Sequence, residues 1–395
     1  MTAPQKPIYL DYNATTPTDP AVLEAMLPWL TTEFGNPSSQ HAYGKAAHAA
    51  VERARAEVAS LIGAHADEIV FTGGGTEATN QALKGAAHHA LRHTGKNLLQ
   101  IAYSVVEHPA TVGAAQSLQA LGFTPTAIPV DRHGVIDLDA LAAALRDPTL
   151  AVSIMHANNE TGTIEPVAAV AAAARRGGAL VHVDAAQSAG KIPVDVTALG
   201  ADLLTLAGHK LYAPKGVGAL YVRRGVQLEP LIHGAGQESG RRAGTENVAY
   251  MVGLGAACRI AGEKLAAAAT RMQVLRDRLW ARLAAGLGDH VVLNGHPIDR
   301  LPNTANVGFV GLIGADVLAA IPEIAASTGS ACHDGNLSIS PVLAAMKVDP
   351  RVAGGAVRLS VGRHTTEAEV DRATELLIER TRGLLAGAAP RTAAA

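Results

Sequence analysis

Short apolar runs that end abruptly at polar or glycine-rich turns recur along the first part of the chain, and helical patterns separate most of them. Five such runs span residues 69–72, 97–102, 150–156, 180–183 and 202–207. Strands of a parallel sheet are buried on both faces and read as continuous apolar runs, and a strand–turn–helix repeat is typical of right-handed βαβ units. We therefore expect an α/β fold with a mainly parallel central sheet and helices on both of its faces.

The length of 395 residues and the hydrophobic content of 48% are enough for two domains that share a core. We predict a large domain over residues 15–260, and a smaller α+β domain formed by residues 1–14 and 261–385. A long helix over residues 248–287 is expected to lead from one to the other. The smaller domain is expected to contain three strands, at residues 291–293, 304–310 and 356–360. Residues 386–395 lack a core-forming pattern and are expected to be a disordered tail.

The composition excludes some classes of partner. Basic and acidic side chains are nearly balanced, 33 against 35, which argues against nucleic acid or an anionic membrane surface. We find no signal-peptide pattern and no apolar run long enough to span a bilayer, so we expect a soluble, cytoplasmic protein. Two cysteines are too few for a disulfide framework, and Cys258, within a helical pattern, is expected to be a small buried hydrophobe.

An aspartate and a lysine follow two of the predicted strands. Asp184 ends the run at residues 180–183, and Lys210 follows the run at residues 202–207. Ligands of α/β proteins bind at the carboxyl ends of parallel strands. Pyridoxal phosphate needs a lysine for its Schiff base and a carboxylate at its pyridine nitrogen, so the pair suggests this cofactor. A simple ion pair at the rim of the sheet explains the same two residues.

A glycine turn at Gly73–Glu77 opens a helix that we expect over residues 78–93. Such a turn offers free N–H groups and the positive end of the helix dipole to a phosphate, and Thr76 adds a hydroxyl. An ordinary helix cap is the alternative. His108 precedes a helix that starts with proline, where it can lie over an aromatic cofactor, although a lone histidine is more often structural.

The sequence surroundings of two further side chains, Arg358 and Cys332, indicate a functional role. Arg358 lies in an apolar strand, where an unpaired charge is costly, so we expect a carboxylate partner from the substrate or the protein. Cys332 stands among small and turn-forming residues, in what we expect to be an exposed loop, and its neighbour His333 favours the thiolate. The arginines among glycines at residues 232–247 favour binding of an oxyanion over packing.

The helix expected at residues 78–93 carries three histidines. His89 and His93 are one turn apart, and His88 precedes them. No third ligand lies near them in the sequence, so we interpret all three as solvated and predict no certain metal site.

Ten motifs of the chain resemble those of the cysteine desulfurases, class V members of the fold-type I pyridoxal phosphate enzymes. They occur in the order found in that family, across nearly the whole sequence: YLDYNATTP, FGNPSS, FTGGGTEATN, EHPA, NNETG, HVDAAQS, GHKLYAPKG, GQESGRRAGTEN, GSAC and VRLSVGR. The resemblance implies the fold-type I transferase fold, pyridoxal 5'-phosphate as cofactor and L-cysteine as substrate.

The resemblance also implies roles for individual residues. Lys210 would form the Schiff base, Asp184 would pair with the pyridinium nitrogen, and Cys332 would be the nucleophile. The cofactor would be bound by Gly75, Thr76, His108, Asn159, Asp184, Gln187, His209, Lys210 and Thr245. Substrate binding would fall to Arg358, Asn13 and Asn159. Lys210, Cys332 and His108 would be catalytic, and Cys332 is also a possible iron–sulfur ligand.

The implied reaction converts L-cysteine to L-alanine and leaves the sulfur on Cys332 as a persulfide. The loop from Cys332 to Pro341 is long, as in the subgroup that passes sulfur to iron–sulfur scaffold proteins or tRNA-thiolation proteins. The resemblance further implies a homodimer in which Thr245 reaches the cofactor of the second subunit.

The chain departs from the family pattern at two places. Ala207 stands where many relatives have a serine or threonine, which removes one hydroxyl at the phosphate unless Thr205 or another donor replaces it. Residues 333–335 also differ, which leaves the sulfur acceptor open. The alternatives are a selenocysteine lyase, another class V lyase or transaminase, or a non-catalytic scaffold. Cys332 in a flexible loop disfavours a transaminase, which needs no mobile thiol. A non-catalytic scaffold is disfavoured because a binding module has no need of Lys210, Asp184, His108 and Cys332 together.

Overall fold

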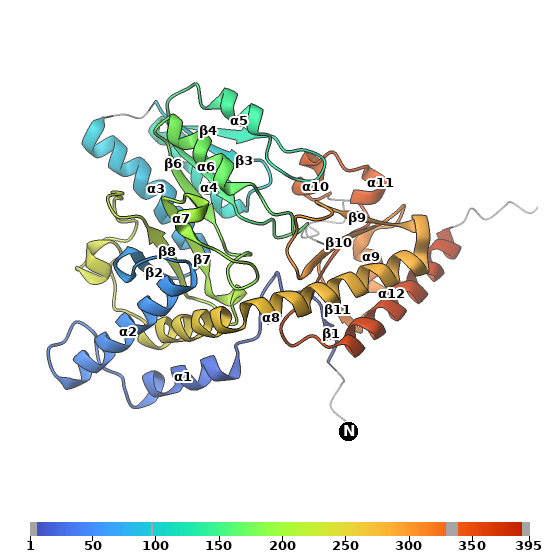
Figure 1. The fold of residues 1–395 in the computed structure, drawn as a ribbon, viewed down its shortest axis with the longest axis horizontal. Coiled ribbons are helices and arrows are strands. Elements are labelled where there is room, and N and C mark those ends of the chain that lie inside the picture. Colours follow the sequence, from blue (N-terminus) through green and yellow to red (C-terminus); the bar gives the residue numbers. More distant parts are fainter. Residues whose placement is uncertain (1–5, 96–97, 329–338, 389–395) are drawn as a thin grey trace, which may run out of the picture.

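A seven-stranded sheet forms the centre of the larger part of the molecule in our computed structural model, which describes residues 6–95, 98–328 and 339–388 (Figure 1). The strand order is β2-β8-β7-β6-β5-β3-β4. The strands are β2 (Ile69–Thr72), β3 (Gln100–Ser104), β4 (Thr124–Ile128), β5 (Thr149–Met155), β6 (Leu180–Asp184), β7 (Leu203–Ala207) and β8 (Gly218–Val222). The pairs from β4 across to β7 are parallel, and β8 is antiparallel to both β7 and β2. The predicted mainly parallel sheet is confirmed.

Helices cover both faces of this sheet, because successive strand residues point to opposite sides. In β2, Val70 packs in one core cluster with Ala78 of α3, whereas Phe71 belongs to a second cluster with Val58 of α2. One face carries α3 (Gly75–Thr94) and α4 (Pro109–Ser117). The other carries α1 (Pro20–Thr31), α2 (Ala42–Leu61), α5 (Leu138–Ala144), α6 (Val167–Arg176), α7 (Val196–Leu199) and the first half of α8 (Val248–Leu287).

The 40-residue helix α8 connects this part to a second hydrophobic core (Figure 1). Its N-terminal half packs in the core of the large sheet, where Cys258 is buried as expected, and its C-terminal half packs in the second core. The second core is built from the antiparallel strands β9 (Val291–Asn294), β10 (Thr304–Phe309) and β12 (Ala356–Ser360), from the parallel pair β1 (Ile8–Tyr9) and β11 (Ile324–Ala325), and from α9 (Gly314–Ala319) and α12 (Glu367–Ala388). The short helices α10 (Pro341–Ala345) and α11 (Pro350–Ala353) lie between β11 and β12 in the chain.

These observations confirm the predicted fold class, an α/β sheet with helices on both faces and a smaller α+β part. The residue boundaries proposed for the two domains stay a prediction. α12 continues to Ala388, so residues 386–388 are helical and not part of a tail, and the rest of the predicted tail, residues 389–395, lies outside the described residues. Within the described ranges, no helix combines the length and the apolar character that a membrane span requires.

A buried ion pair fixes the loop at residues 233–247 to the large sheet. Glu238 accepts hydrogen bonds from Arg55 Nη1 and Nη2 of α2, at 2.7 and 2.8 Å, and from the backbone N–H of Phe71 at 2.8 Å. The side chains of Arg55 and Glu238 are 8% and 1% exposed. Glu238 itself has a positive φ of 50°, an unfavourable conformation for a residue with a side chain. The ion pair therefore compensates for a strained backbone and holds the loop in place.

Replacing Glu238 by Gln is expected to lower the free energy of unfolding by about 3 kcal/mol, because Arg55 would stay buried without its carboxylate. Glu52→Gln is the matched control: Glu52 also bonds Arg55, at 3.0 Å, but its side chain is 46% exposed. Because water screens the exposed Glu52 carboxylate, we expect its loss to cost about 1 kcal/mol or less. Urea unfolding followed by circular dichroism measures both changes, and equal losses for the two variants would contradict this account.

Candidate active site

The carboxyl ends of β5, β6 and β7 border a cavity of about 380 Å³. These strands are neighbours and run parallel, so the turns that follow them meet at one edge of the sheet. The cavity is lined by ten of the predicted site residues: Asn13, Gly75, Thr76, His108, Asn159, Asp184, Gln187, His209, Lys210 and Arg358. Thr245 is exposed on a separate loop, and Cys332 lies outside the described residues. The fold brings the ten together, and their individual roles stay predictions.

Lys210 lies in a single 3₁₀ turn, Gly208–Lys210, that follows β7. Its Nζ donates hydrogen bonds to the backbone oxygens of Asn13 and Ala14, at 2.5 and 2.6 Å. Burial and, to a smaller extent, the positive charge of Arg358 together lower the pKa of Lys210 to about 8, against the opposing charges of Asp11 and Asp184. A small fraction of this amine, much larger than for an ordinary lysine, is therefore uncharged near neutral pH, and this is the form that can act as a nucleophile or a base.

Asp184 is buried at the end of β6, where its Oδ1 accepts a hydrogen bond from the backbone N–H of Ala186 at 2.9 Å. Burial raises the pKa of Asp184, while the hydrogen bond from Ala186 and the neighbouring His108 and Lys210 oppose that rise. A second buried carboxyl, Glu107, accepts a hydrogen bond from the N–H of Met155 at 2.6 Å. Burial and the neighbouring Asp184 raise the pKa of Glu107 well above its usual range. A cation bound beside Asp184 would restore its charge.

His108 is the N-cap of α4, as the following proline predicts. Its Nδ1 accepts a hydrogen bond from the backbone N–H of Ala110 at 3.1 Å, which fixes the ring at the wall of the cavity. Burial lowers the pKa of His108, with an opposing contribution from Asp184. The imidazole is therefore mainly uncharged, and its ring can stack on a flat ligand.

The end of the cavity at α3 has the features of a phosphate site. The helix begins at Gly75, three residues earlier than expected, because Gly74 takes a φ of 148° that favours glycine. The N–H groups of the first turn, which include those of Gly75 and Thr76, have no intrahelical partner and can bind an anion. His209 faces the same cavity and is held by Thr15, whose Oγ1 is 3.2 Å from its Nδ1.

Thr205 does not replace the hydroxyl that Ala207 lacks. Its Oγ1 is bonded to His182 Nε2 at 2.9 Å and to Thr79 Oγ1 at 3.2 Å, and it is not part of the cavity wall. Thr79, which the sequence did not single out, does line the cavity. The Thr205 hydroxyl is therefore bonded to the buried His182 and does not replace the missing hydroxyl at residue 207.

Arg358 has the carboxylate partner that its apolar strand predicts. Its Nη2 is 2.8 Å from Asp11 Oδ1, and its Nη1 donates to the backbone oxygen of Asn159 at 3.1 Å. Among the described residues, none accepts a hydrogen bond from Arg358 Nε. The guanidinium is thus held at the cavity with bonding capacity left for a ligand.

Asn13 and Lys191 form a polar network beneath the cavity. The side chain of Asn13 is engaged by four protein groups, from Asn159, Lys191, Asn303 and Thr304. Lys191 also donates to Gln187 Oε1 at 2.7 Å, and burial lowers the pKa of Lys191 well below its usual range. Sequence reasoning missed Lys191 and Glu107, because no local pattern distinguishes a buried lysine or glutamate from a solvated one.

The arginine-rich loop binds protein groups. Arg242 Nε is 2.9 Å from Glu77 Oε1 in the first turn of α3, and Arg241 Nη2 donates to the backbone oxygen of Asp67 at 3.0 Å. The oxyanion expected from the sequence is thus, for Arg242, a carboxylate of the same chain. These contacts hold the loop beside the start of α3 and leave Thr245 exposed.

The residues that line the cavity fit pyridoxal phosphate. Lys210 supplies a partly uncharged amine, Asp184 a buried carboxylate, His108 a fixed ring, and the start of α3 a phosphate site. The site therefore defines a fold-type I pyridoxal phosphate enzyme.

Comparison with known sequences identifies the family. The chain matches the Aminotransferase class-V family over residues 8–373. It is 46% identical over 384 residues to a protein named cysteine desulfurase from Trichormus azollae, which covers 95% of this chain and 94% of that protein. It is 44% identical over 375 residues to the cysteine desulfurase IscS of Dictyoglomus turgidum, which covers 94% of each.

Solved structures give the same result. A NifS-like protein matches with a TM-score of 0.87 and 37% identity, covering 96% of this chain and 99% of that one. SspA, solved in complex with cysteine, matches with a TM-score of 0.77 and 34% identity, covering 91% and 99%. The chain belongs to the class V aminotransferases, which are pyridoxal phosphate enzymes. The predicted cofactor and the resemblance to the cysteine desulfurases are confirmed.

We expect the Lys210 amine of the cofactor-free protein to titrate near pH 8, because burial and Arg358 both disfavour its protonated form. Only the deprotonated amine reacts, so acylation of Lys210 should level off shortly above that pH. Competitive acylation over a pH series, read by mass spectrometry, measures this titration, with the exposed Lys45 of α2 as reference for the reagent. Reactivity that keeps rising to about pH 10, as for an ordinary lysine, would contradict the proposed surroundings.

Proposed function

We propose that this protein is a pyridoxal-phosphate-dependent cysteine desulfurase, which converts L-cysteine to L-alanine and transfers the sulfur to Cys332. The observation that carries this proposal is the meeting of Lys210, Asp184 and Arg358 in one cavity. An amine for proton transfer, a carboxylate for the cofactor ring and a guanidinium for the substrate are the three groups that such a reaction on an amino acid requires.

The cofactor, when bound, withdraws electrons from the substrate and so weakens the bond between its β-carbon and sulfur. Asp184 keeps the ring nitrogen protonated. The Lys210 amine, partly uncharged near neutral pH, removes the α-proton and later returns a proton to the product. Arg358, held by Asp11, binds the substrate carboxylate and orients the amino acid.

Cys332 is proposed as the nucleophile that takes the sulfur. Its thiolate attacks the substrate sulfur, the bond to the β-carbon breaks, and a persulfide forms on Cys332. The described residues on either side of its segment support this role. Ser327 pairs through its backbone with Arg358, and Ser340 donates a side-chain hydrogen bond to Glu160, next to Asn159 of the cavity wall. Both ends of the segment are thus anchored beside the site.

Three finer points belong to the same proposal. The long segment from Cys332 to Pro341 is suited to passing sulfur to a protein acceptor, an iron–sulfur scaffold or a tRNA-thiolation protein. The protein is proposed to act in the cytoplasm as a homodimer. Exposure of Thr245 outside the cavity of its own chain supports a dimer in which this residue completes the phosphate site of the partner.

Replacing Lys210 by Ala is expected to remove the visible absorption band of the bound cofactor and to lower alanine formation from L-cysteine by about 10²–10⁴-fold, the usual contribution of a positioned acid–base group. Cys332→Ala is expected to retain the band but to form no persulfide, because the attacking sulfur is gone. Alanine, sulfide and protein-bound persulfide are measured beside the absorption spectrum.

Cys258→Ala is the matched control for this experiment, since it removes the other cysteine of the chain, which is buried in α8. It should keep both the band and the activity. Full-rate sulfide release by Cys332→Ala would reject that residue as the nucleophile. A wild-type protein that forms neither the band nor alanine after cofactor is added would instead indicate a non-catalytic scaffold.

For the homodimer, we expect light scattering to give twice the mass of one chain. Thr245→Ala should weaken cofactor binding by about tenfold, the loss of one hydrogen bond to a charged group, and should leave the dimer intact. Thr31→Ala, an exposed threonine on α1, is the control. Unchanged cofactor affinity of Thr245→Ala, measured by fluorescence titration, would remove Thr245 from the phosphate site.

A further inference from the structure

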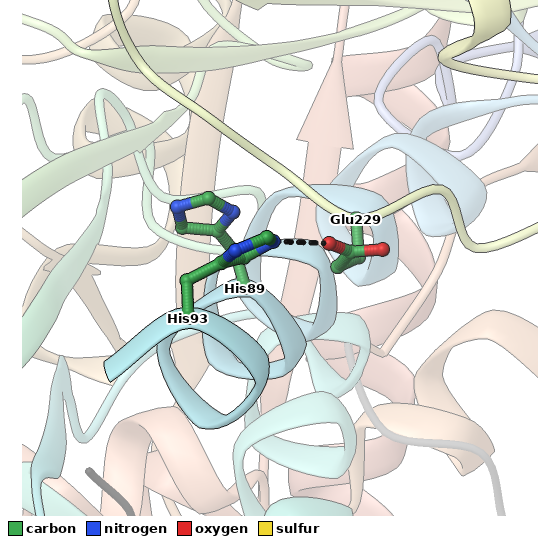
Figure 2. A group of neighbouring side chains, drawn as sticks. All are labelled: His89, His93 and Glu229. Carbon is green, nitrogen blue, oxygen red and sulfur yellow. Dashed lines mark hydrogen bonds and ion pairs between the residues drawn. The ribbon is translucent and has the colours of Figure 1, made fainter. Parts of the chain in front are cut away.

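Two histidines of α3 and a glutamate from a distant segment lie together on the protein surface. Figure 2 shows His89 and His93, one turn apart on α3, with the carboxylate of Glu229 beside His93. Glu229 follows β8 in the chain and is 136 residues from His93. No third ligand lies near these histidines in the sequence, but the fold brings one close from a distant part of the chain, which the sequence did not indicate.

The three side chains have the spacing of a metal-binding group. One ligand atom from each lies within 4.8 Å of the other two. His93 Nε2 is 3.1 Å from Glu229 Oε1, and the two imidazole rings have their centroids 4.4 Å apart. In a tetrahedral zinc site, bonds of about 2.0–2.1 Å place ligand atoms about 3.3 Å apart. Small rotations of the partly exposed side chains close the difference.

The backbone of Glu229 is fixed against α3. Its N–H donates to the oxygen of Gly85 at 3.0 Å, and its own carbonyl accepts from Gln81 Nε2 at 3.0 Å. A Cβ at Gly85 would lie 2.8 Å from that carbonyl oxygen, so the contact requires glycine. Arg92 Nη1 binds Glu229 Oε2 at 2.9 Å, which orients the carboxylate and leaves Oε1 toward the histidines. The fold therefore holds Glu229 beside the two histidines of α3 before any ion binds.

An ordinary surface ion pair accounts for only part of this arrangement. Glu229 pairs with Arg92 and His93, but no hydrogen bond or ion pair to the side chain of His89 exists in the described part of the chain. His89 nevertheless stacks beside His93, at a tilt of 34°. A cation bound by His89, His93 and Glu229 together would give the His89 side chain a partner.

We propose that His89, His93 and Glu229 bind one divalent transition-metal ion, with Zn²⁺ as the best match. Two imidazoles and a carboxylate suit zinc and its neighbours in the first transition series, whereas magnesium and calcium prefer oxygen ligands. A water molecule completes the coordination. The site is separate from the catalytic cavity, since His93 lies 17 residues beyond Thr76 on α3, about 25 Å at a rise of 1.5 Å per residue.

The ion would connect α3 to the segment after β8. This segment is otherwise held to the helix by the hydrogen bonds of Glu229 and by Leu231 N–H to Gln81 Oε1, at 2.7 Å. Binding to the folded state alone raises the temperature of unfolding. The site therefore acts as a structural clamp at the C-terminal half of the helix whose first turn faces the cofactor.

The test is zinc binding by the tag-free, cofactor-loaded protein, measured by calorimetry with ZnCl₂. Cys332 is replaced by Ser in all samples, so that its thiol does not compete for the metal. We expect one Zn²⁺ per chain and a raised temperature of unfolding. His93→Ala and Glu229→Gln should each weaken zinc binding by about tenfold or more, because loss of even an outer-shell partner costs that much.

His88→Ala is the matched control, since His88 is exposed on the same helix but does not belong to the cluster. It should bind zinc like the parent protein. The visible cofactor band verifies that each variant is folded, and anomalous diffraction from a zinc-soaked crystal locates the ion. Absence of saturable binding, equal binding by His93→Ala, or an anomalous peak only at another place would each overturn the proposal.

Discussion

The cost of burying charge at the carboxyl edge of the sheet determines the chemistry of the site. Lys210 and Asp184 both lose hydration there, so burial lowers the pKa of the lysine to about 8 and raises that of the aspartate. The first effect prepares an amine that can transfer protons near neutral pH. The second leaves a carboxylate that is most stable beside a cation, which the protonated ring of pyridoxal phosphate provides. One physical constraint thus adjusts both groups for the same ligand.

The N-terminal segment joins the two hydrophobic cores around this edge. The backbone oxygen of Asn13 accepts from Lys210 and from Gln187, and the side chain of the same residue bonds Asn303 and Thr304 in the smaller part. Asp11, two residues earlier, holds Arg358. The turn at residues 11–14 therefore sets the position of the Lys210 amine on one side and of the Arg358 guanidinium on the other.

The strands and the cavity could be predicted because their causes are local or cumulative. Buried parallel strands are continuous apolar runs, and Asp184 and Lys210 follow them directly. The edge strand β4 was missed since its residues are half exposed and show no such run. Lys191, Glu107 and Glu229 were missed for another reason: their meaning depends on partners that are distant in the sequence. No local pattern could indicate that Glu229 lies beside His93, or that Lys191 is buried and donates a hydrogen bond to Gln187.

Ala207, at the end of β7, has no hydroxyl to offer to a phosphate in the cavity, so other groups would have to bind it. A Cβ on Gly75 would lie 3.1 Å from the Cβ of Ala207, so the start of α3 approaches β7 closely. Thr205, on the same strand, is committed to His182. We therefore expect anion binding to depend on the N–H groups of the first helical turn, which carry a partial positive charge without any ionisable side chain. Because burial lowers the pKa of His209 to about 4, this histidine is uncharged at neutral pH and could offer a phosphate only a hydrogen bond.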